Sequence, residues 1–196
     1  MDQKWKGWKC RTAIATGITI WCALVGIAYA QTGGNPAAAA RAFLEASQVF
    51  FHPRCVNCHP AGDAPLQGDN MRPHSMQVKR GPAGMGKSAM QCSNCHQAAN
   101  LRGVHMPPGA PDWQMPPEDL PMIFEKLTPR QLCLQLKDPA KNGNRSPKEV
   151  VDHNREAALV LWGWNPGEGR TPIPMPHETF VKYMTEWAEN GAACPE

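Results

Sequence analysis

The sequence lacks the residue patterns on which several large classes of enzyme depend. Its 196 residues contain no phosphate-binding glycine loop, no Ser/His/Asp arrangement and no cluster of carboxylates suited to a metal ion. Uninterrupted stretches for long helices or sheets are also missing, because 20 prolines and 17 glycines are spread along the chain. These absences argue against a large α/β enzyme. The apolar fraction of 42% and the charged fraction of 19% predict a globular protein of one or two small domains.

The N-terminal segment has the features of a secretory signal peptide. Four basic residues within positions 1–11 precede an apolar run over residues 13–28, and Ala28-Tyr29-Ala30 supply small residues at the two positions that a signal peptidase recognises. We therefore expect residues 1–30 to be removed on export to the periplasm. The alternative is an uncleaved membrane anchor, since the apolar run approaches the roughly 20 residues that span a bilayer.

Cleavage after Ala30 changes the charge and the cysteine content of the chain. It removes four of the 20 Lys and Arg residues and one of the 17 Asp and Glu residues, which leaves sixteen of each and a neutral mature protein. No basic surface for nucleic acid is expected. Cys10 and Cys22 leave with the signal, and six cysteines remain in an oxidising compartment.

Four of these cysteines form two copies of one pentapeptide pattern. The copies are Cys55-Val-Asn-Cys58-His59 and Cys92-Ser-Asn-Cys95-His96, each a C-x-x-C followed at once by His. Two thiols at this spacing can each bond one vinyl-derived carbon of the same porphyrin, and the adjacent imidazole can then bind the iron. The pattern predicts two covalently attached haem c groups, with His59 and His96 as the proximal iron ligands.

Other uses of paired cysteines explain less of this pattern. In a zinc site the two pairs typically lie 15–20 residues apart, whereas 33 residues separate Cys58 from Cys92. A thioredoxin-type pair belongs in a βαβ unit, which this proline-rich chain does not predict. Zinc, plain disulfides and redox dithiols remain the alternatives.

On these two pentapeptides the chain resembles the c-type cytochromes, specifically small exported dihaem ones. The likeness covers the first half of the mature chain well and the second half loosely. A second resemblance, to small dihaem proteins labelled isoquinoline 1-oxidoreductase subunits, rests on three segments: His52-Pro53-Arg54, Arg72-Pro73-His74 and Leu161-Trp162-Gly163-Trp164-Asn165-Pro166-Gly167. That resemblance implies an electron acceptor for a molybdenum-containing hydroxylase.

The short distance between the two pentapeptides indicates one domain. Only 37 positions separate Cys55 from Cys92, and a small domain rarely folds below about 40–70 residues. We expect residues 31–196 to form a single compact dihaem cytochrome c-type domain, mainly α with extensive Pro/Gly-rich loops. The two haems would then be neighbours.

Local patterns place four helices around these loops. Residues 37–51 predict a helix that Pro53 ends, with a buried stripe of Phe43, Leu44, Ala46, Phe50 and Phe51. Residues 60–121 predict loops laid over the haem faces.

The C-terminal part predicts the other three helices. Thr128 caps a helix that begins at Pro129, ends near Asp138 and buries Leu132, Cys133 and Leu136. Ser146 opens another with a capping box, carrying Val150, His153 and Ala157 on adjoining turns. The last begins near Pro176, carries Phe180, Tyr183, Met184 and Trp187 at helical spacing, and ends at Gly191.

Two cysteines remain once the haems have taken four. Cys133 lies on a predicted helix and Cys194 follows the last one, so a Cys133–Cys194 disulfide would tie the C-terminal tail to the domain. Two unpaired buried thiols are the alternative.

Several side chains compete for the sixth coordination position of the two irons. We expect His74, in a loop beyond His59, and His153, on a capped helix before Trp162, to be the distal ligands, with His52 as the substitute. Further candidates are Met106 and Met115, each followed by two prolines, and His105, which adjoins Met106. His177 is expected in the first turn of the last helix. The tryptophans at 113, 162, 164 and 187 are expected to pack in the core or against haem.

The sequence thus predicts a periplasmic electron-transfer protein and not an enzyme. Single electrons would pass through the two haems from a donor dehydrogenase to an acceptor cytochrome or oxidase, with no nucleic acid as partner and a membrane only if the signal is retained. One alternative is a haem enzyme, a peroxidase or small-molecule reductase, in which one iron keeps an open position. Another is a filament subunit in which haems of successive chains stack.

Overall fold

The N-terminal helix of the computed structural model carries the chain to the first pentapeptide. The structure describes residues 33–196, so the expected signal peptide lies outside the described part. Helix α1 (Pro36–Phe50) begins at Asn35, whose side chain accepts a hydrogen bond from the Ala38 amide. Phe43, Ala46 and Phe50 of the predicted stripe are buried, which confirms the helix. The prediction for Leu44 is wrong: its side chain is 47% exposed, because it lies beside the buried stripe.

Pro53 begins a helix, where the sequence predicted only that it ends one. Helix α1 ends at Phe50, and the short helix α2 (Pro53–Val56) follows with Pro53 at its first position. Proline is well suited to that position, because the first amides of a helix have no intrahelical acceptor. The ring Nδ1 of His52 caps α2 by accepting from the Arg54 amide at 3.2 Å.

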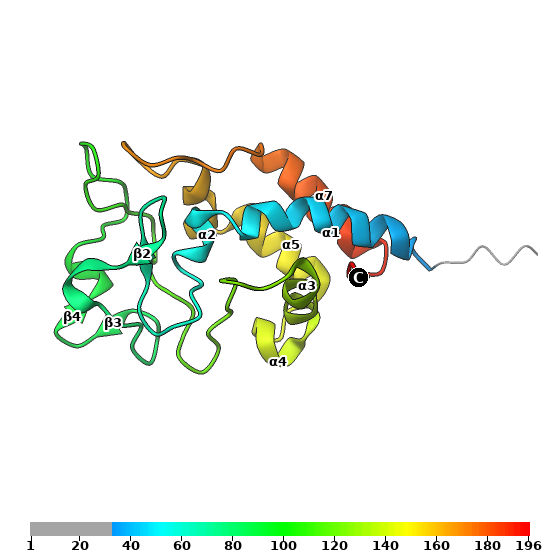
Figure 1. Ribbon diagram of the computed structural model, residues 1–196, viewed down its shortest axis with the longest axis horizontal. Coiled ribbons are helices and arrows are strands. Elements are labelled where there is room, and N and C mark those ends of the chain that lie inside the picture. Colours follow the sequence, from blue (N-terminus) through cyan, green and yellow to red (C-terminus); the bar gives the residue numbers. More distant parts are fainter. Residues whose placement is uncertain (1–32) are drawn as a thin grey trace, which may run out of the picture. The chain divides into compact units, whose positions relative to one another are not determined.

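The loop-rich middle of the chain contains only very short elements. Strands β1 (Leu66–Gln67) and β2 (Arg72–Pro73) form one antiparallel hairpin, and β3 (Gly86–Lys87) and β4 (Met90–Gln91) form another. The 3-10 turns η1 (Ser75–Gln77) and η2 (Cys92–Asn94) follow these hairpins. Figure 1 shows these segments gathered at one side of the helices. The predicted loop character of residues 60–121 is confirmed.

Buried Arg80 holds these loops together. Its guanidinium donates to the carbonyls of Gly62, Pro116 and Pro121, each at 3.1 Å, and its own amide donates to the Asp63 carbonyl at 2.8 Å. Since neutral carbonyls satisfy the buried charge, one side chain fixes three loop segments that lack a hydrophobic core of their own.

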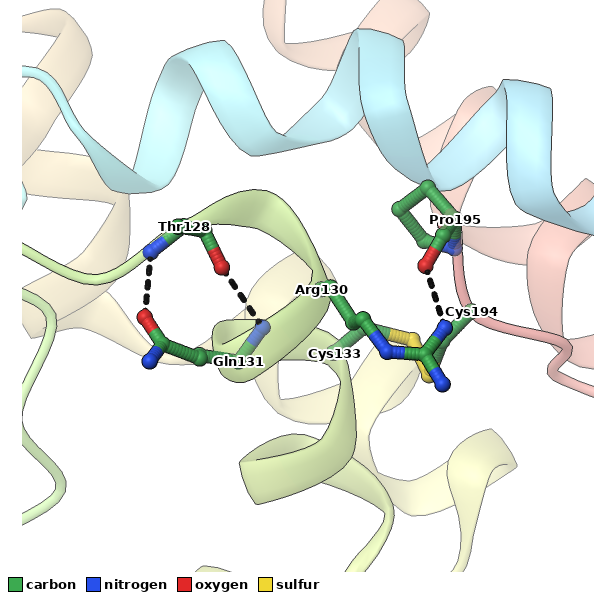
Figure 2. Close-up of a disulfide and its surroundings, with 6 residues drawn as sticks. All are labelled: Thr128, Arg130, Gln131, Cys133, Cys194 and Pro195. Carbon is green, nitrogen blue, oxygen red and sulfur yellow. Dashed lines mark hydrogen bonds between the residues drawn. A yellow bond between two sulfur atoms is a disulfide. The ribbon is translucent and has the colours of Figure 1, made fainter.

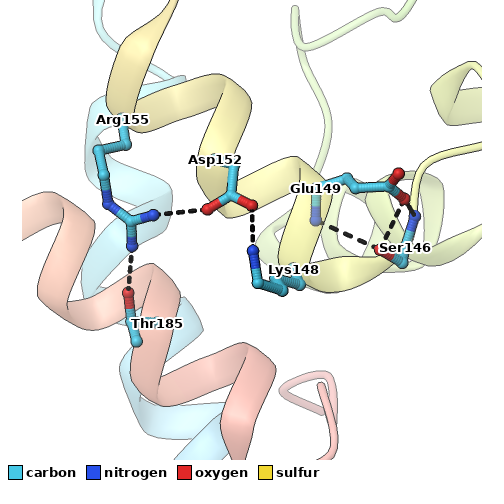
Figure 3. A network of polar contacts seen from close by, with 6 residues as sticks. All are labelled: Ser146, Lys148, Glu149, Asp152, Arg155 and Thr185. Atoms are coloured by element: carbon cyan, nitrogen blue, oxygen red, sulfur yellow. Dashed lines mark hydrogen bonds and ion pairs between the residues drawn. The ribbon is translucent and has the colours of Figure 1, made fainter.

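Two predicted helix starts are confirmed by their capping boxes. Helix α3 (Pro129–Lys137) begins after Thr128, which exchanges hydrogen bonds with Gln131 (Figure 2). Helix α5 (Pro147–Glu156) begins after Ser146, which does the same with Glu149 (Figure 3). The sequence did not predict three short elements: α4 (Pro139–Asn142), α6 (Ala158–Leu161) and η3 (Trp162–Trp164).

The core forms where α7 (His177–Glu189) packs on α1 and α5. Phe43 and Trp187 pack with ring centroids 5.3 Å apart, and Phe50 meets Phe180 edge to face at the same distance. Arg155 of α5 donates to the Thr185 hydroxyl of α7 at 3.3 Å (Figure 3). The described residues are therefore mainly helical and form one compact unit. Within this part of the chain, no helix is long and apolar enough to cross a membrane.

A disulfide between Cys133 and Cys194 joins α3 to the C-terminal tail, which confirms the predicted pairing. The two Cα atoms lie 5.6 Å apart and 61 positions apart in sequence. Beside this bond, Arg130 donates to the Pro195 carbonyl at 2.9 Å (Figure 2). The tail is thus fixed to the helical core by a covalent bond and a hydrogen bond.

Candidate functional site

The two pentapeptides adopt the same helical turn. In the first, the amides of Cys58 and His59 each donate to the Cys55 carbonyl at 3.1 Å. In the second, the corresponding amides donate to the Cys92 carbonyl at 3.1 and 2.9 Å. Residues three and four positions apart lie on one face of such a turn. Both cysteines and the histidine of each copy therefore project to the same side.

The cysteines of the pentapeptides are free thiols in this structure. Burial raises the pKa of Cys55 to about 12 and that of Cys58 to about 11. The neighbouring Cys92 adds to the shift in the pKa of Cys58. Over residues 33–196, no three His, Cys, Asp or Glu side chains converge on a point where they could bind a bare metal ion.

The ring of His59 is held in one orientation by two contacts. Its Nδ1 lies 2.6 Å from the Met122 carbonyl, and its face stacks on Phe124 with centroids 3.9 Å apart and planes 9° from parallel. Since a carbonyl oxygen can only accept, Nδ1 carries the proton and Nε2 keeps its lone pair. Burial lowers the pKa of His59 to about 4. The imidazole is therefore neutral at pH 7, the form that binds metals.

His96 repeats this arrangement at the second pentapeptide. Its Nδ1 lies 2.7 Å from the Pro108 carbonyl, and its face stacks on Trp113 with centroids 4.6 Å apart and planes 7° from parallel. Burial lowers the pKa of His96 as well. In each copy a carbonyl from a later loop fixes the tautomer and an aromatic ring fixes the plane, which is how proteins orient histidine ligands.

Gly109 allows the loop after His96 to close tightly. A Cβ atom at this position would overlap the backbone carbonyls of Gln97 and Ala99. The Gly109 amide donates to the Asn100 side chain at 3.0 Å. The absence of a side chain thus lets the chain turn back and present the adjacent Pro108 carbonyl to His96.

The first pentapeptide opens onto a cavity of about 270 Å³. Cys55, Cys58 and His59 line one part of it, and His153 of α5 lines another. Buried Met115 also lines it, so the structure brings two of the predicted distal candidates to the same cavity. The remaining lining is largely apolar and includes Phe50, Phe124, Leu136, Val150 and Trp162. This volume exceeds the ~150 Å³ that holds benzene in an engineered protein core.

His74 lies beside the second pentapeptide. Its ring centroid is 6.1 Å from that of His96, and the two planes are inclined at 61°. The Nδ1 of His74 lies 2.8 Å from the Ser75 carbonyl and so carries the proton, which leaves Nε2 as the free ring nitrogen. Of the predicted distal ligands, the structure therefore places His74 near His96 and His153 in the cavity of His59.

The other candidates occupy different places. His52 caps α2 and is not among the side chains that line the cavity. The amide of His105 donates to the Glu168 carbonyl at 3.1 Å, and the side chain of Met106 is 41% exposed. His177 is the first residue of α7, as predicted, and its Nε2 lies 3.0 Å from the Asn154 carbonyl.

Two tryptophans connect the two sites. Trp113, stacked on His96, meets Trp162 edge to face with centroids 4.9 Å apart. Trp162 lines the cavity of the first site, and its Nε1 donates to the Asn100 side chain at 2.9 Å. Both rings pack, as the sequence predicted, and they form part of the boundary between the two sites.

Arg54 is a site residue to which sequence reasoning assigned no role. Its side chain is 1% exposed, lines the cavity and pairs with an Asp69 carboxylate oxygen at 2.5 Å. The guanidinium lies 5.8 Å from the centre of the Trp162 ring, and its Nε has no hydrogen-bond partner. Its place in the His52-Pro53-Arg54 segment, directly before Cys55, is the sequence signal that pointed to it.

The geometry thus brings two equivalent pentapeptides together in one compact unit, each with an oriented histidine and a second histidine nearby. Neither the protein-family models nor the curated proteins nor the solved structures contain a match to this chain.

Proposed function

We propose that this chain is a dihaem c-type cytochrome that relays single electrons in the periplasm. One haem c would be held by Cys55, Cys58 and His59, and the other by the corresponding residues of the second pentapeptide. The observation that carries the proposal is the repeated helical turn whose histidine donates from Nδ1 to a carbonyl, at 2.6 Å in one copy and 2.7 Å in the other. Each Nε2 is left free to bind iron.

The residues around the first pentapeptide fit a haem. Their cavity is largely apolar, as a porphyrin requires, and it contains one buried cation. The unpartnered Nε of Arg54 is a donor that a haem carboxylate could satisfy, since a buried donor without a partner costs about 1–3 kcal/mol. An iron already bound in a porphyrin needs only axial ligands from the protein, so a cluster of three protein ligands is not required.

The second site fits the same group through its histidine pair. A haem held by Cys92 and Cys95 would take His96 as one iron ligand, and a second histidine beside it could supply the other. The observed separation between His74 and His96 is 6.1 Å. Because the Nδ1 atom of each ring is engaged by a carbonyl, both rings have the tautomer that such a pair needs.

These contacts favour a relay over a haem enzyme. A bound haem supplies one-electron Fe(III)/Fe(II) chemistry, and its axial ligands set the potential. His74 beside the second pentapeptide and His153 or Met115 beside the first offer a sixth ligand to each iron, whereas a peroxidase or reductase needs an open position. The partners we propose are a donor dehydrogenase, including one of the molybdenum hydroxylase type, and an acceptor cytochrome or oxidase.

Counting covalent haem per chain tests this proposal. The full chain is expressed in a bacterium with a c-type maturation system, and haem is quantified in the purified protein after denaturation. We expect two covalent haems in the wild type and about one in both Cys58→Ser and Cys95→Ser, because each variant damages one attachment site. Cys133→Ser is the matched control and should retain two. A wild-type protein without covalent haem would overturn the proposal.

The coordination state separates the relay from the enzyme. Near-infrared magnetic circular dichroism of the oxidised protein reports the axial ligands of low-spin haems. We expect two six-coordinate irons with His/His or His/Met ligands. A high-spin iron with water or no ligand opposite its histidine would favour catalysis.

A further inference from the structure

The charges of this chain are strongly segregated along its sequence. Residues 70–111, which contain the second pentapeptide, include five Lys and Arg residues and no Asp or Glu. The rest of the described chain has eleven basic and sixteen acidic residues. The neutral total therefore conceals a basic segment around one site and an acidic remainder.

Four of the five basic side chains in this segment are exposed: Arg72, Lys79, Lys87 and Arg102. Within residues 33–196, none of the four forms an ion pair. Of the acidic residues that contact this region from outside the segment, Asp69 pairs with Arg54 and Glu168 accepts from the Gly103 amide at 3.4 Å. Exposed Glu118 and Asp119 lie against Pro82, but neither pairs with one of these four basic side chains. The exposed charges are thus available to a partner.

The same segment has exposed apolar side chains. It contributes six of the nine large exposed hydrophobic residues in the described part of the chain: Met71, Met76, Met85, Leu101, Val104 and Met106. Met76 is 68% exposed and Met85 is 53% exposed. Apolar groups next to unpaired charges are typical of protein interaction surfaces.

Several of these residues lie next to the second site in the chain. The Cys92 amide donates to the Met85 carbonyl at 2.9 Å, and Lys87 lies in the β3–β4 hairpin that leads into Cys92. Met76 follows two residues after His74, whose ring lies 6.1 Å from that of His96. Cys95 is itself exposed, whereas the first pentapeptide opens onto a cavity lined by core helices.

We propose that the surface around the second site, made of Arg72, Lys79, Lys87, Met76 and Met85, is the docking surface for an acidic redox-partner protein. This inference rests on the proposed function, and it assigns electron exchange with the partner to the second haem. Exposed lysines steer an acidic protein toward the site and raise its association rate. The methionines supply the small apolar contact of a transient redox complex. The first haem, held in its cavity, would exchange electrons through the second.

Charge reversal with a matched control tests the surface. The exposed pair Lys79→Glu/Lys87→Glu is compared with Lys137→Glu/Lys182→Glu, which makes the same change in net charge at exposed positions on α3 and α7. Reduced protein is mixed with hexacyanoferrate(III), an anionic oxidant, at low ionic strength in a stopped-flow instrument. We expect the first pair to slow oxidation about 10-fold and the control pair less than 2-fold, with the difference lost at high salt.

A short polyglutamate serves as the acidic polypeptide probe. It should slow oxidation of the wild type and of the control pair by occupying the surface, and should leave Lys79→Glu/Lys87→Glu unaffected. The inference would be overturned if the two charge-reversal variants were oxidised equally slowly, or if polyglutamate slowed the oxidation of both variants. Two other results would also overturn it. If the wild type self-associates in sedimentation and only Lys79→Glu/Lys87→Glu abolishes this, the surface binds a second copy of the chain. If the wild type binds phosphatidylserine vesicles and only this variant abolishes binding, the surface binds lipid. A protein without a haem spectrum would instead contradict the proposed function.

Discussion

The imidazole rings of His74 and His96 lie 6.1 Å apart between centroids, with their planes inclined at 61°. A different backbone carbonyl orients each ring: the Ser75 carbonyl accepts from His74, and the Pro108 carbonyl accepts from His96. The pair is therefore arranged by the protein itself. If the pair binds a haem iron as proposed, side chains held in this way would need to move little when the charge on the iron changes, which favours fast electron transfer.

Removing His74 should open the second iron. In His74→Ala we expect one of the two ferrous haems to bind carbon monoxide, because its sixth position is no longer filled by the protein. His74→Met should restore six-coordination and raise one reduction potential, within the ~0.8 V range that axial ligands span. His105→Ala, a change at an exposed histidine, is the control and should leave spectra and potentials unchanged. Unchanged spectra in His74→Ala would remove His74 from the ligand set.

At the first site, a pair of variants decides between the two distal candidates. His153 and Met115 both line the cavity of His59. We expect His153→Ala to convert one haem to a high-spin, carbon monoxide-binding form, while Met115→Leu, which nearly conserves volume, leaves coordination intact. Magnetic circular dichroism checks both variants. The reverse result would assign the sixth position to the methionine.

The disulfide should contribute to stability without affecting haem attachment. A bond that closes a loop across 61 positions stabilises a fold by on the order of 3–4 kcal/mol. We expect the double variant Cys133→Ser/Cys194→Ser to unfold at a clearly lower guanidinium concentration and still to carry two haems. Denaturation of the exported wild type and variant measures the difference. An unchanged midpoint would show that the tail does not constrain the unfolded chain.

The interaction of Asp69 with Thr171 and Arg54 should depend on pH. The Thr171 hydroxyl, which donates to the Asp69 carboxylate at 2.6 Å, is the main cause that lowers the pKa of this carboxyl, and the Arg54 charge adds to it. A carboxyl with a lowered pKa in the folded state stabilises the fold above its unfolded pKa of about 3.9, and this contribution is lost as pH falls through the folded value. The side chain is 46% exposed, so the expected contribution is modest, about 1 kcal/mol.

We therefore expect Asp69→Asn to be less stable than the wild type at pH 6, with a difference that shrinks progressively below about pH 4. Urea denaturation across this range measures the free energy of unfolding of both proteins. In Thr171→Val, which removes the hydroxyl donor, the pKa of Asp69 should return toward its ordinary value, so the pH-dependent loss of stability should be smaller and should be complete at a higher pH. A constant difference between wild type and Asp69→Asn from pH 6 to pH 3 would contradict the assignment.

Predictions from local sequence were accurate where a single turn of chain decides the structure. Thr128 and Ser146 cap helices as expected, because a hydroxyl followed by Gln or Glu three residues later satisfies the first amides within that same turn. Where two local rules compete, the prediction was incomplete. Pro53 can follow one helix or open another, and the second outcome goes with the His52 ring, which accepts from the Arg54 amide.

The sequence by itself determined the two C-x-x-C-H turns, the capped helices and the cysteine pair that closes the tail. These features depend on residues a few positions apart, or on the elimination of other partners. Only the tertiary structure decided which later loops supply the Met122 and Pro108 carbonyls, that His74 meets His96, and that His153 faces the cavity of His59. Such contacts join positions far apart in the chain, and they arise from how the whole chain packs, which no local pattern contains.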